Sequence, residues 1–500
     1  MPPPDKALSI NIIIKEQQNA QKFLYKKHKF ENKLRQNLFN IYNAYKGEKL
    51  MQRARHLEIS SFIPPPNGRR IHNGLLIWDE DFRTVERYQE YKDCGFTEIM
   101  FAGEDRYLGE PFETSDIKKM LDMAHQVGLK AILVDKRIMH ISLKAVSSPL
   151  NEFFKGDEKA FSNFIADCIK DYQNHPAFYG VAIIDEPVIE KAGIVTELTK
   201  AIKTANPKVF VHTCFLPMDW TYGESNERSL YFFGKGFKDC WDSYGNYVDA
   251  MCKTNVGYYG YDWYPLGFDD YKNGVSTVSP FYVGAMQFSK GITAKNGLPF
   301  HMTIQSYSTG ANMDIRHTYE CDFNWQTNLC LGFGAEKIYY YTYWRWRIRY
   351  DDNVNDHSAI MDDDGTKMMY DDVQKNNAYA KRVYEYLCDY DYVASKVLKT
   401  DIREQCLDGV KETDFGFITD YKAIAPVLIN KMSGDKGDIY MVMNMRDPYF
   451  KNDVNSVELK MENPKSEYDV IVDGYLTKVK CDDGYLKFDL KAGQAVFVLG

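Results

Sequence analysis

The sequence predicts a (β/α)₈ barrel that carries a helical N-terminal extension and a C-terminal antiparallel β-sandwich. The 500 residues exceed what one hydrophobic core usually organises, so more than one domain is expected. Short apolar runs alternate with amphipathic stretches through the middle of the chain, which indicates parallel strands joined by crossover helices. No glycine-rich phosphate loop follows the first run, which favours a closed barrel over an open doubly wound sheet.

Changes in composition and in the hydrophobic pattern give the domain limits. Residues 1–66 contain Lys, Gln, Asn and Leu at helical spacing and end in a proline-rich breaker, which indicates a helical extension. Residues 67–394 hold the alternating elements of the barrel. Residues 395–500 contain short alternating strands separated by turn pairs such as Asp473-Gly474 and Asp483-Gly484, as in a small antiparallel sandwich.

The apolar runs of the middle segment give eight expected barrel strands. They lie at Gly74–Trp78, Glu98–Ala102, Lys130–Val134, Phe178–Ile184, Val209–Phe215, Tyr258–Trp263, Phe300–Ile304 and Lys337–Thr342. The clearest helix follows the second strand, because Ser115 offers an N-cap, an apolar stripe starts at Ile117, and Gly128 ends it. Later helices are expected at Pro280–Thr293, Thr318–Leu331 and Lys367–Leu387.

Composition and charge restrict the partners. The formal net charge of -8 disfavours non-specific binding to nucleic acid or anionic lipid, and no apolar run approaches the roughly 18 residues of a membrane span. The 37 Tyr and 7 Trp suit a carbohydrate partner, because aromatic faces stack on sugar rings, although a large core also uses tyrosine. The sequence does not indicate an oligomeric state.

Cofactors and metals are not expected. The ten cysteines are scattered without the paired spacings of zinc or redox sites, so we interpret them as reduced core residues. Motifs of metalloproteases, serine hydrolases and P-loop proteins are missing. Neither a signal-peptide pattern nor an N-glycosylation sequon occurs, so we expect a cytoplasmic location unless a signal has been removed.

The chemistry of such a barrel is expected where its strands end, since active sites lie at that face. Carboxylates and aromatic residues follow several of the expected strands there. Glycosidic cleavage needs these types: a carboxylic acid protonates the leaving oxygen, a second polar group stabilises the positive centre or activates water, and aromatic platforms hold the ring. The candidate catalytic residues are Glu186 and Asp262, and the candidate substrate-binding residues are Gln305, Asp185, Trp344, Tyr264, His212, Trp78, Glu104 and Tyr341.

Two of these candidates have equally good structural interpretations. Asp185 stands where a carboxylate could cap a following helix. His212 lies inside an apolar strand, so its side chain could face the barrel core.

Three segments resemble clan A glycoside hydrolases. The segment from His175 to Pro187, ending in Asp-Glu-Pro, resembles their fourth barrel strand, where the Glu is the general acid/base. Residues 261–265 resemble the end of strand six in related barrels, and Trp344 resembles their sugar-stacking tryptophan. The likeness covers about residues 70–390. It implies a barrel glycosidase with Glu186 as general acid/base and a carbohydrate substrate.

Strand seven departs from that pattern, because it ends in Gln305 where a nucleophilic Glu is expected. A neutral amide cannot form the glycosyl ester. Asp262 is the leading replacement, and Glu104 is less favoured because it arises across the barrel mouth. Alternatives are substrate assistance, with Asp262 or Gln305 orienting a sugar acetamido group, and an inverting base about 6.5–9.5 Å from Glu186. A catalytically inactive glycan-binding barrel and a purely structural barrel are the alternatives from other classes.

Overall fold

The computed structural model describes residues 56–72, 75–78, 80–102, 105–218, 231–233, 240–270, 275–309, 315–345, 358–398 and 405–500. Most of the predicted N-terminal extension and the candidate Glu104 lie outside these residues. Within the described part of the chain, no helix combines the length and apolarity that a membrane span requires.

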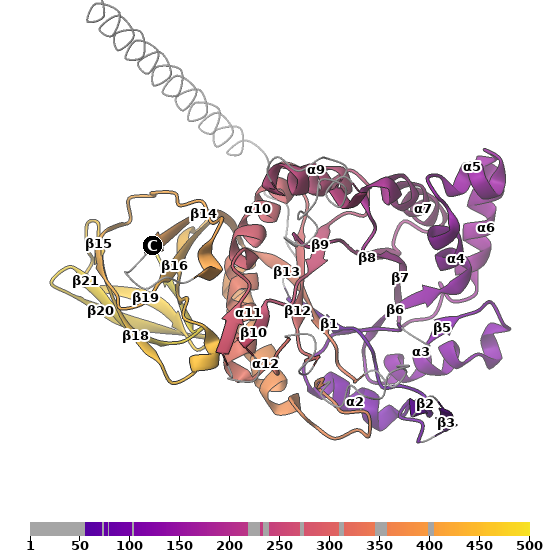
Figure 1. Ribbon diagram of the computed structural model, residues 1–500, viewed down its shortest axis with the longest axis horizontal. Helices are drawn as coiled ribbons and strands as arrows, with labels where there is room; N and C mark the ends of the chain where they lie inside the picture. Colours follow the sequence, from indigo (N-terminus) through magenta and orange to yellow (C-terminus); the bar gives the residue numbers. More distant parts are fainter. Residues whose placement is uncertain are drawn as a thin grey trace, which may run out of the picture. The chain divides into compact units, whose positions relative to one another are not determined.

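A closed barrel of parallel strands forms the centre of the described residues (Figure 1). Its eight strands are β1 (Glu58–Ser61), β4 (Glu98–Met100), β6 (Lys130–Asp135), β7 (Phe178–Asp185), β8 (Phe210–Cys214), β9 (Tyr259–Asp262), β12 (Phe300–Gln305) and β13 (Ala335–Tyr341). They pair in the orders β4-β6-β7-β8 and β9-β12-β13-β1. Hydrogen bonds close both seams, among them those from the Thr97 N–H to the Ile59 carbonyl (2.8 Å) and from the Phe215 N–H to the Gly260 carbonyl (2.9 Å).

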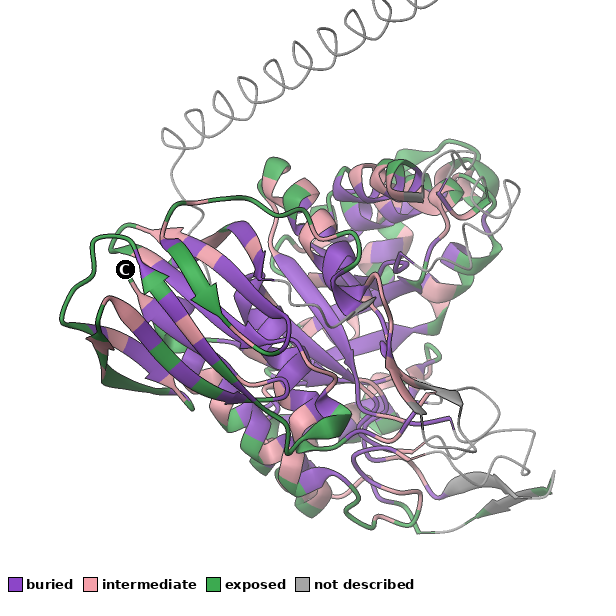
Figure 2. Cartoon of the chain, turned by 60° about the vertical axis from the view of Figure 1, so that its left-hand side comes forward, coloured by how far each residue is buried: buried purple, intermediate pink, exposed green. Residues whose placement is uncertain are grey.

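Helices surround the barrel, as the crossover pattern predicts. They are α2 (Val85–Asp93), α3 (Asp116–Gln126), α4 (Lys136–Lys144), α5 (Pro149–Phe154), α6 (Glu158–Lys170), α7 (Ala192–Ala205), α9 (Cys240–Cys252), α10 (Tyr282–Lys295), α11 (Glu320–Gly332) and α12 (Tyr370–Leu387). Helix α3 shows why they form: the Ser115 side chain accepts the Lys118 N–H, and the stripe from Ile117 to Ala124 is buried. Buried residues concentrate where helices meet strands (Figure 2).

The prediction of the first barrel strand is wrong. Residues Leu75–Trp78 form β3, which pairs antiparallel with β2 (Arg69–His72) as a hairpin, and the first barrel strand is β1, paired in parallel with β13. Strand β1 has the sequence Glu-Ile-Ser-Ser, and its buried Ser60 and Ser61 give no apolar signal. The apolar hairpin instead exposes Leu75 and Trp78 to solvent. The other seven strands overlap their predicted positions.

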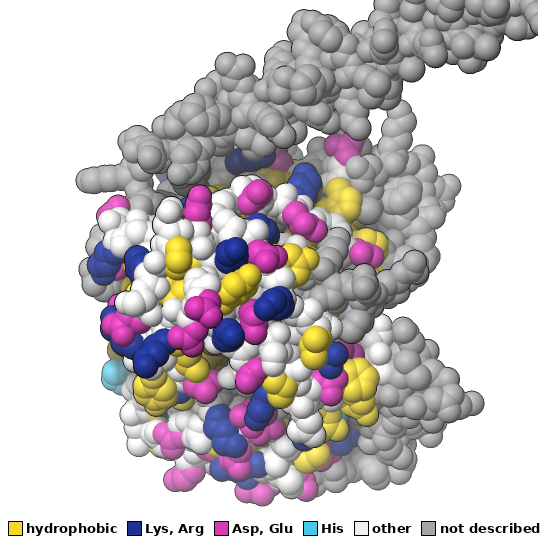
Figure 3. Space-filling view, turned by 90° about the vertical axis from the view of Figure 1, so that its left-hand side faces the viewer, with side chains coloured by type: hydrophobic (Ala, Val, Ile, Leu, Met, Phe, Trp, Pro, Cys, Tyr) yellow, Lys and Arg dark blue, Asp and Glu magenta, His cyan; other side chains and the backbone are white. Residues whose placement is uncertain are grey.

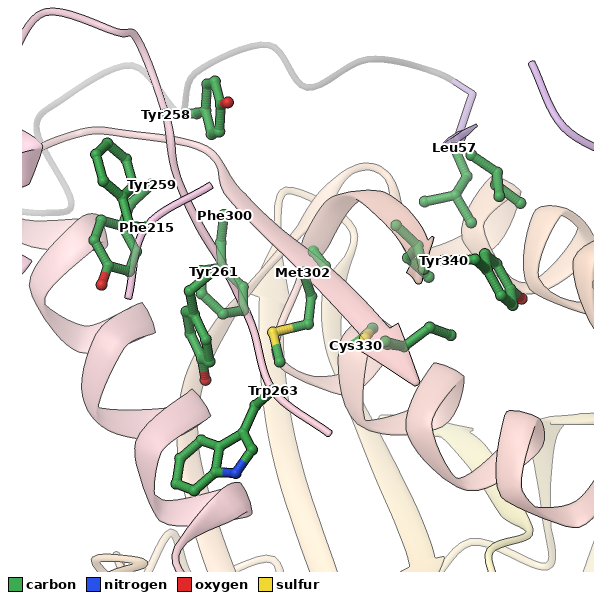
Figure 4. Packing of buried hydrophobic residues seen from close by; sticks show 14 of the residues in the cluster. Leu57, Phe215, Tyr258, Tyr259, Tyr261, Trp263, Phe300, Met302, Cys330 and Tyr340 are labelled. Carbon is green, nitrogen blue, oxygen red and sulfur yellow. The ribbon is translucent and has the colours of Figure 1, made fainter. Parts of the chain in front are cut away.

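Alternation along β9 decides which way its side chains point. Tyr259, Tyr261 and Trp263 point to the side of the strand that faces the helices (Figure 4). There the Tyr259 ring stacks on Phe215 with ring centres 5.1 Å apart. Successive residues of a strand face opposite sides, so Asp262 points toward the barrel axis.

The C-terminal residues form an antiparallel β domain. Its nine described strands are β14 (Tyr390–Leu398), β15 (Ile418–Lys422), β16 (Val427–Gly434), β17 (Gly437–Asn444), β18 (Val454–Met461), β19 (Glu467–Val472), β20 (Tyr475–Asp482), β21 (Tyr485–Lys491) and β22 (Ala495–Leu499). Strand β20 pairs with β19 at one end and β21 at the other, so it links two sheets that enclose a core of their own. Both residues of each predicted Asp-Gly turn have positive φ, which the tight hairpins require.

Candidate active site

Strand β7 brings two carboxyl groups to the barrel mouth. Its middle residues are buried, whereas Asp185 and Glu186 at its C-terminal end are exposed. The Glu186 N–H donates to the Cys214 carbonyl of β8 at 2.9 Å, while its φ of 43° turns the chain away from the strand. A positive φ is unfavourable for a non-glycine residue, and such strain concentrates at functional sites.

The Glu186 side chain is hydrogen-bonded to Asp262 at the end of β9. The Asp262 carboxylate also accepts the Tyr264 hydroxyl (2.7 Å) and the Cys214 thiol (3.6 Å). Two carboxyl groups can share a hydrogen bond only when one of them holds a proton. Asp262 accepts from two further donors, Tyr264 and Cys214, which favour its ionised form. Burial raises the pKa of Asp262, and these hydrogen bonds oppose the rise.

Asp185 adds a third carboxyl group beside this pair. Burial among surrounding protein atoms, and then the negative charge of Asp262, raise the pKa of Asp185 to about 7. Its side chain nevertheless keeps access to solvent. The mouth therefore holds one carboxyl group, Asp185, that titrates near neutral pH, and a second, Asp262, whose pKa is raised.

Four half-buried aromatic residues stand next to the carboxyl groups; we call Phe62, Tyr264, Tyr307 and Tyr341 the aromatic cluster. They follow or end strands β1, β9, β12 and β13. The Tyr341 ring centre lies 5.7 Å from Phe62, 5.3 Å from Tyr264 and 5.0 Å from Tyr307. Since Tyr264 also donates to Asp262, the cluster and the carboxyl pair form one continuous surface.

Gln305 is not part of this surface, which corrects the prediction that it contacts substrate. Its side chain is fully buried. The amide oxygen accepts the Leu266 N–H at 3.0 Å, and the amide nitrogen donates to the carbonyls of Leu266 and Arg316, both at 3.1 Å. The amide thus fixes the segments after strands six and seven, and no group of it is left for a ligand.

Trp344 and His212 are also corrected. Trp344 is fully buried, with its ring centre 4.8 Å from Phe82, so it cannot stack on a sugar. His212 lies inside the barrel, 5.0 Å from Tyr339 between ring centres, and burial lowers the pKa of His212 to about 3. Both residues support the fold.

The remaining candidates divide between the mouth and its surroundings. The structure brings Glu186, Asp262, Asp185, Tyr264 and Tyr341 together. Trp78 is 72% exposed on the β2–β3 hairpin and is not one of the residues brought together at the mouth. Sequence reasoning left Phe62 and Tyr307 out of the site. The position of Tyr307 directly after strand seven could have indicated it. Phe62 could not be identified in this way, because the first strand was predicted at the wrong place in the sequence.

A possible metal site among the described residues is the acidic turn Asp362-Asp363-Asp364, whose carboxylate oxygens lie within 4.8 Å of one another. Asp362 already pairs with Arg345 at 2.9 Å, and Asp364 accepts the Thr366 N–H at 2.8 Å. These contacts are those of a structured turn.

Comparison with known proteins places the fold. No protein-family model matches the sequence, and no curated protein matches it. Solved structures do: a family 42 β-galactosidase from G. stearothermophilus gives a TM-score of 0.53 at 8% identity, covering 89% of this chain and 98% of that one. The chain has the fold of barrel glycoside hydrolases. An α-amylase from Geobacillus thermoleovorans, solved with acarbose, gives a TM-score of 0.48 at 13% identity, covering 91% and 99%.

In (β/α)₈ barrel enzymes, the active site lies at the C-terminal ends of the strands. Asp185 and Glu186 end β7, Asp262 ends β9, and the aromatic cluster follows the neighbouring strands. The carboxyl groups therefore lie on the face that the fold uses for chemistry.

Proposed function

We propose that this chain is a glycoside hydrolase in which Glu186 donates a proton to the glycosidic oxygen. The observation that carries the proposal is the hydrogen bond between the Glu186 and Asp262 side chains at the barrel mouth. A general acid must hold its proton at the working pH. Sharing a proton with Asp262, beside the further carboxyl group of Asp185, favours the protonated form of Glu186.

The aromatic cluster supports a sugar as the substrate. Its rings are half-buried, so each offers part of its face or edge to the mouth. The C–H groups of a pyranose ring pack against such faces. Tyr264 has a second effect, because its hydroxyl fixes the orientation of the Asp262 carboxylate. A ring held on this cluster would lie next to the proton of Glu186.

We do not propose Glu186 and Asp262 as an acid–nucleophile pair of the usual kind. Retaining glycosidases keep the two carboxyl groups about 5–5.5 Å apart and inverting ones about 6.5–9.5 Å, because a sugar carbon or a water must fit between them. Hydrogen-bonded carboxyl groups leave no such space. We assign to Asp262 the role of holding the proton on Glu186. The group that meets the anomeric carbon is then Asp185 or a substituent of the substrate itself, such as an acetamido group.

The test replaces Glu186 by Gln, which keeps the shape but removes the acidic proton. Glu190→Gln is the matched control, because Glu190 is an exposed residue four positions later. Both variants and the wild type are assayed on a panel of aryl glycosides and natural oligosaccharides. We expect Glu186→Gln to lower kcat/KM on the natural substrate by about 10²–10⁴-fold, the usual contribution of a general acid, with the control unchanged. Undiminished turnover by Glu186→Gln contradicts the proposal.

The runner-up is a glycan-binding barrel without catalysis. The buried Gln305 at the end of strand seven favours it, since no carboxylate stands at that position. This function predicts saccharide binding by the wild type without cleavage of any substrate in the panel.

A further inference from the structure

A polar cavity lies outside the group of residues at the barrel mouth. It has a volume of about 760 Å³ and is bounded by α11, α12 and the turns of the β domain. Residues from three parts of the chain line it: Asn324 and Asn328 on α11, Asn376 and Tyr379 on α12, and Asn452 and Gln494 in the β domain. None of these residues belongs to the aromatic cluster or is one of the three carboxyl groups at the mouth, Asp185, Glu186 and Asp262.

The side chains of this cavity suit a ligand rich in hydroxyl groups. Five of the six residues just named are carboxamides, which both donate and accept hydrogen bonds, as sugar hydroxyls do. Asn328, Asn376 and Gln494 already bond protein groups. Asn324 and Asn452 make no side-chain hydrogen bond among the described residues, so their amides are free to bind. The Tyr379 hydroxyl donates to the Asn328 amide oxygen at 2.6 Å and so holds the Asn328 side chain in place.

The charges of the cavity favour a neutral ligand over an anionic one. Its lining has four cations, Lys375, Arg382, Lys451 and Lys491, and three carboxylates, Glu320, Asp372 and Asp473. The two signs nearly cancel. The surface of the β domain likewise mixes both signs without a single-sign patch on the face shown in Figure 3. A phosphorylated or acidic ligand would require a cationic lining.

We propose that this cavity binds a neutral oligosaccharide segment. Its volume lies in the usual range of small-ligand sites and accommodates one or two sugar rings. Tyr379 is half-buried in the wall, so it offers ring surface for the apolar face of a sugar. The proposal goes beyond the proposed hydrolysis and does not depend on it, because binding here involves no residue of the barrel mouth.

The test measures binding in the full-length Glu186→Gln protein, so that no substrate is cleaved. Isothermal titration is performed with maltohexaose, cellohexaose, xylohexaose and mannohexaose, and with oligogalacturonate as the anionic probe. Asn324→Ala/Asn452→Ala removes the two free amides, and Asn324→Trp fills the cavity. Asn174→Ala is the control, because Asn174 is exposed and lies outside the lining. Thermal denaturation checks that each variant is folded.

We expect at least one neutral hexasaccharide to bind, with an affinity that both cavity variants lower at least tenfold and the control leaves unchanged. The rate on a small aryl glycoside should not change in the cavity variants when Glu186 is intact. Binding of oligogalacturonate alone, or neutral-glycan binding that neither cavity variant weakens, overturns the proposal. So does failure of all four neutral probes to bind. The binding loss in the cavity variants is measured against their Glu186→Gln parent, so it is distinguishable from the loss of turnover that tests Glu186.

Discussion

Asp185 is the carboxyl group at the mouth whose protonation changes near neutral pH. Its pKa of about 7 lies above that of an unfolded Asp, because burial and the charge of Asp262 disfavour its ionised form. Between about pH 4 and pH 7 the folded protein therefore binds more protons than the unfolded chain. The free energy of unfolding falls as the pH rises through this window.

Asp185→Asn should remove this pH dependence. We expect the variant to have a higher Tm than the wild type at pH 8, where the wild-type carboxylate is ionised, and a similar Tm at pH 4. Glu190→Gln is the control and should shift the Tm equally at both pH values. A lower Tm for Asp185→Asn at pH 8 contradicts the assigned environment.

A substitution at Gln305 tests whether strand seven differs from that of a retaining glycosidase only by the loss of its nucleophile. In Gln305→Glu, the Leu266 and Arg316 carbonyls lose their donor, and a carboxylate would face them in a buried position. We expect a loss of about 2–4 kcal/mol in the free energy of unfolding at pH 8, less at pH 4 where the acid is protonated, and no gain in hydrolysis. Denaturant titration and the glycoside panel measure both effects. A stable variant with increased turnover would show that the position remains catalytic.

The sequence predicted those site residues whose position relative to a strand end is enough to place them at the barrel mouth. Asp185, Glu186 and Asp262 follow strand ends directly, so the barrel rule placed them at the mouth. Gln305 and Trp344 also follow strand ends, but both side chains are buried: Gln305 bonds the backbone of Leu266 and Arg316, and Trp344 packs against Phe82. Side-chain direction at such positions depends on tertiary contacts that the sequence pattern does not contain.

At the scale of elements, strand β1 takes part in a buried network of charges as well as in the apolar core. Lys337 on β13 is buried and pairs with Glu58 of β1 at 2.8 Å and Glu98 of β4 at 2.9 Å. Burial raises the pKa of Glu98 to about 7, while the pKa of Glu58 is lowered to about 2 by Lys337 and Lys130, which outweigh the opposing effect of its burial. This network ties together the strands at one seam of the barrel. The sequence pattern did not reveal β1, because Ser60 and Ser61 give no apolar signal and Lys337 is far from Glu58 in the sequence.

Lys337→Met leaves the buried Glu98 without a cation. We expect it to lower the free energy of unfolding by about 3–5 kcal/mol at pH 8. The loss should be smaller at pH 5, because Glu98 is then protonated. Lys130→Met is the control: Lys130 is half-exposed, so its loss should cost about 1 kcal/mol or less. Equal losses for the two variants in denaturant titrations would contradict the role given to Lys337.

At the scale of the whole described chain, α11 joins the barrel to the β domain. The Asn328 amide donates to the Gly493 carbonyl at 3.1 Å, and the buried Arg316–Asp322 pair extends to Asp447 of the β domain at 3.5 Å. The sequence predicted both domains because its hydrophobic pattern changes, from alternating strands and helices in the barrel to short strands and turns in the β domain. It did not predict their contact, because polar residues on a helix give the same sequence pattern whether they face solvent or another domain.

Gly332 at the end of α11 tests how closely the two domains pack. A Cβ atom at this position would overlap the side chain of Met441, which is fully buried in the β domain. We expect Gly332→Ala to reduce the free energy of unfolding by about 1–3 kcal/mol. Gly291→Ala is the matched control, since nothing lies near its Cβ in α10, and it should stabilise by about 0.5–1 kcal/mol. Thermal denaturation of both variants measures the difference, and stabilisation by Gly332→Ala contradicts the close contact.

The central claim is that Glu186 supplies the proton to the departing oxygen, and the dependence of rate on leaving-group acidity tests it most directly. Once the panel has identified the sugar, wild type and Glu186→Gln are compared on aryl glycosides of that sugar with phenols of graded pKa. A phenol of low pKa departs without a proton, whereas an alkyl group needs one. We predict that Glu186→Gln keeps most of its activity on the 2,4-dinitrophenyl glycoside and loses about 10²–10⁴-fold on the alkyl glycoside. The same rate loss for every leaving group would contradict this role for Glu186.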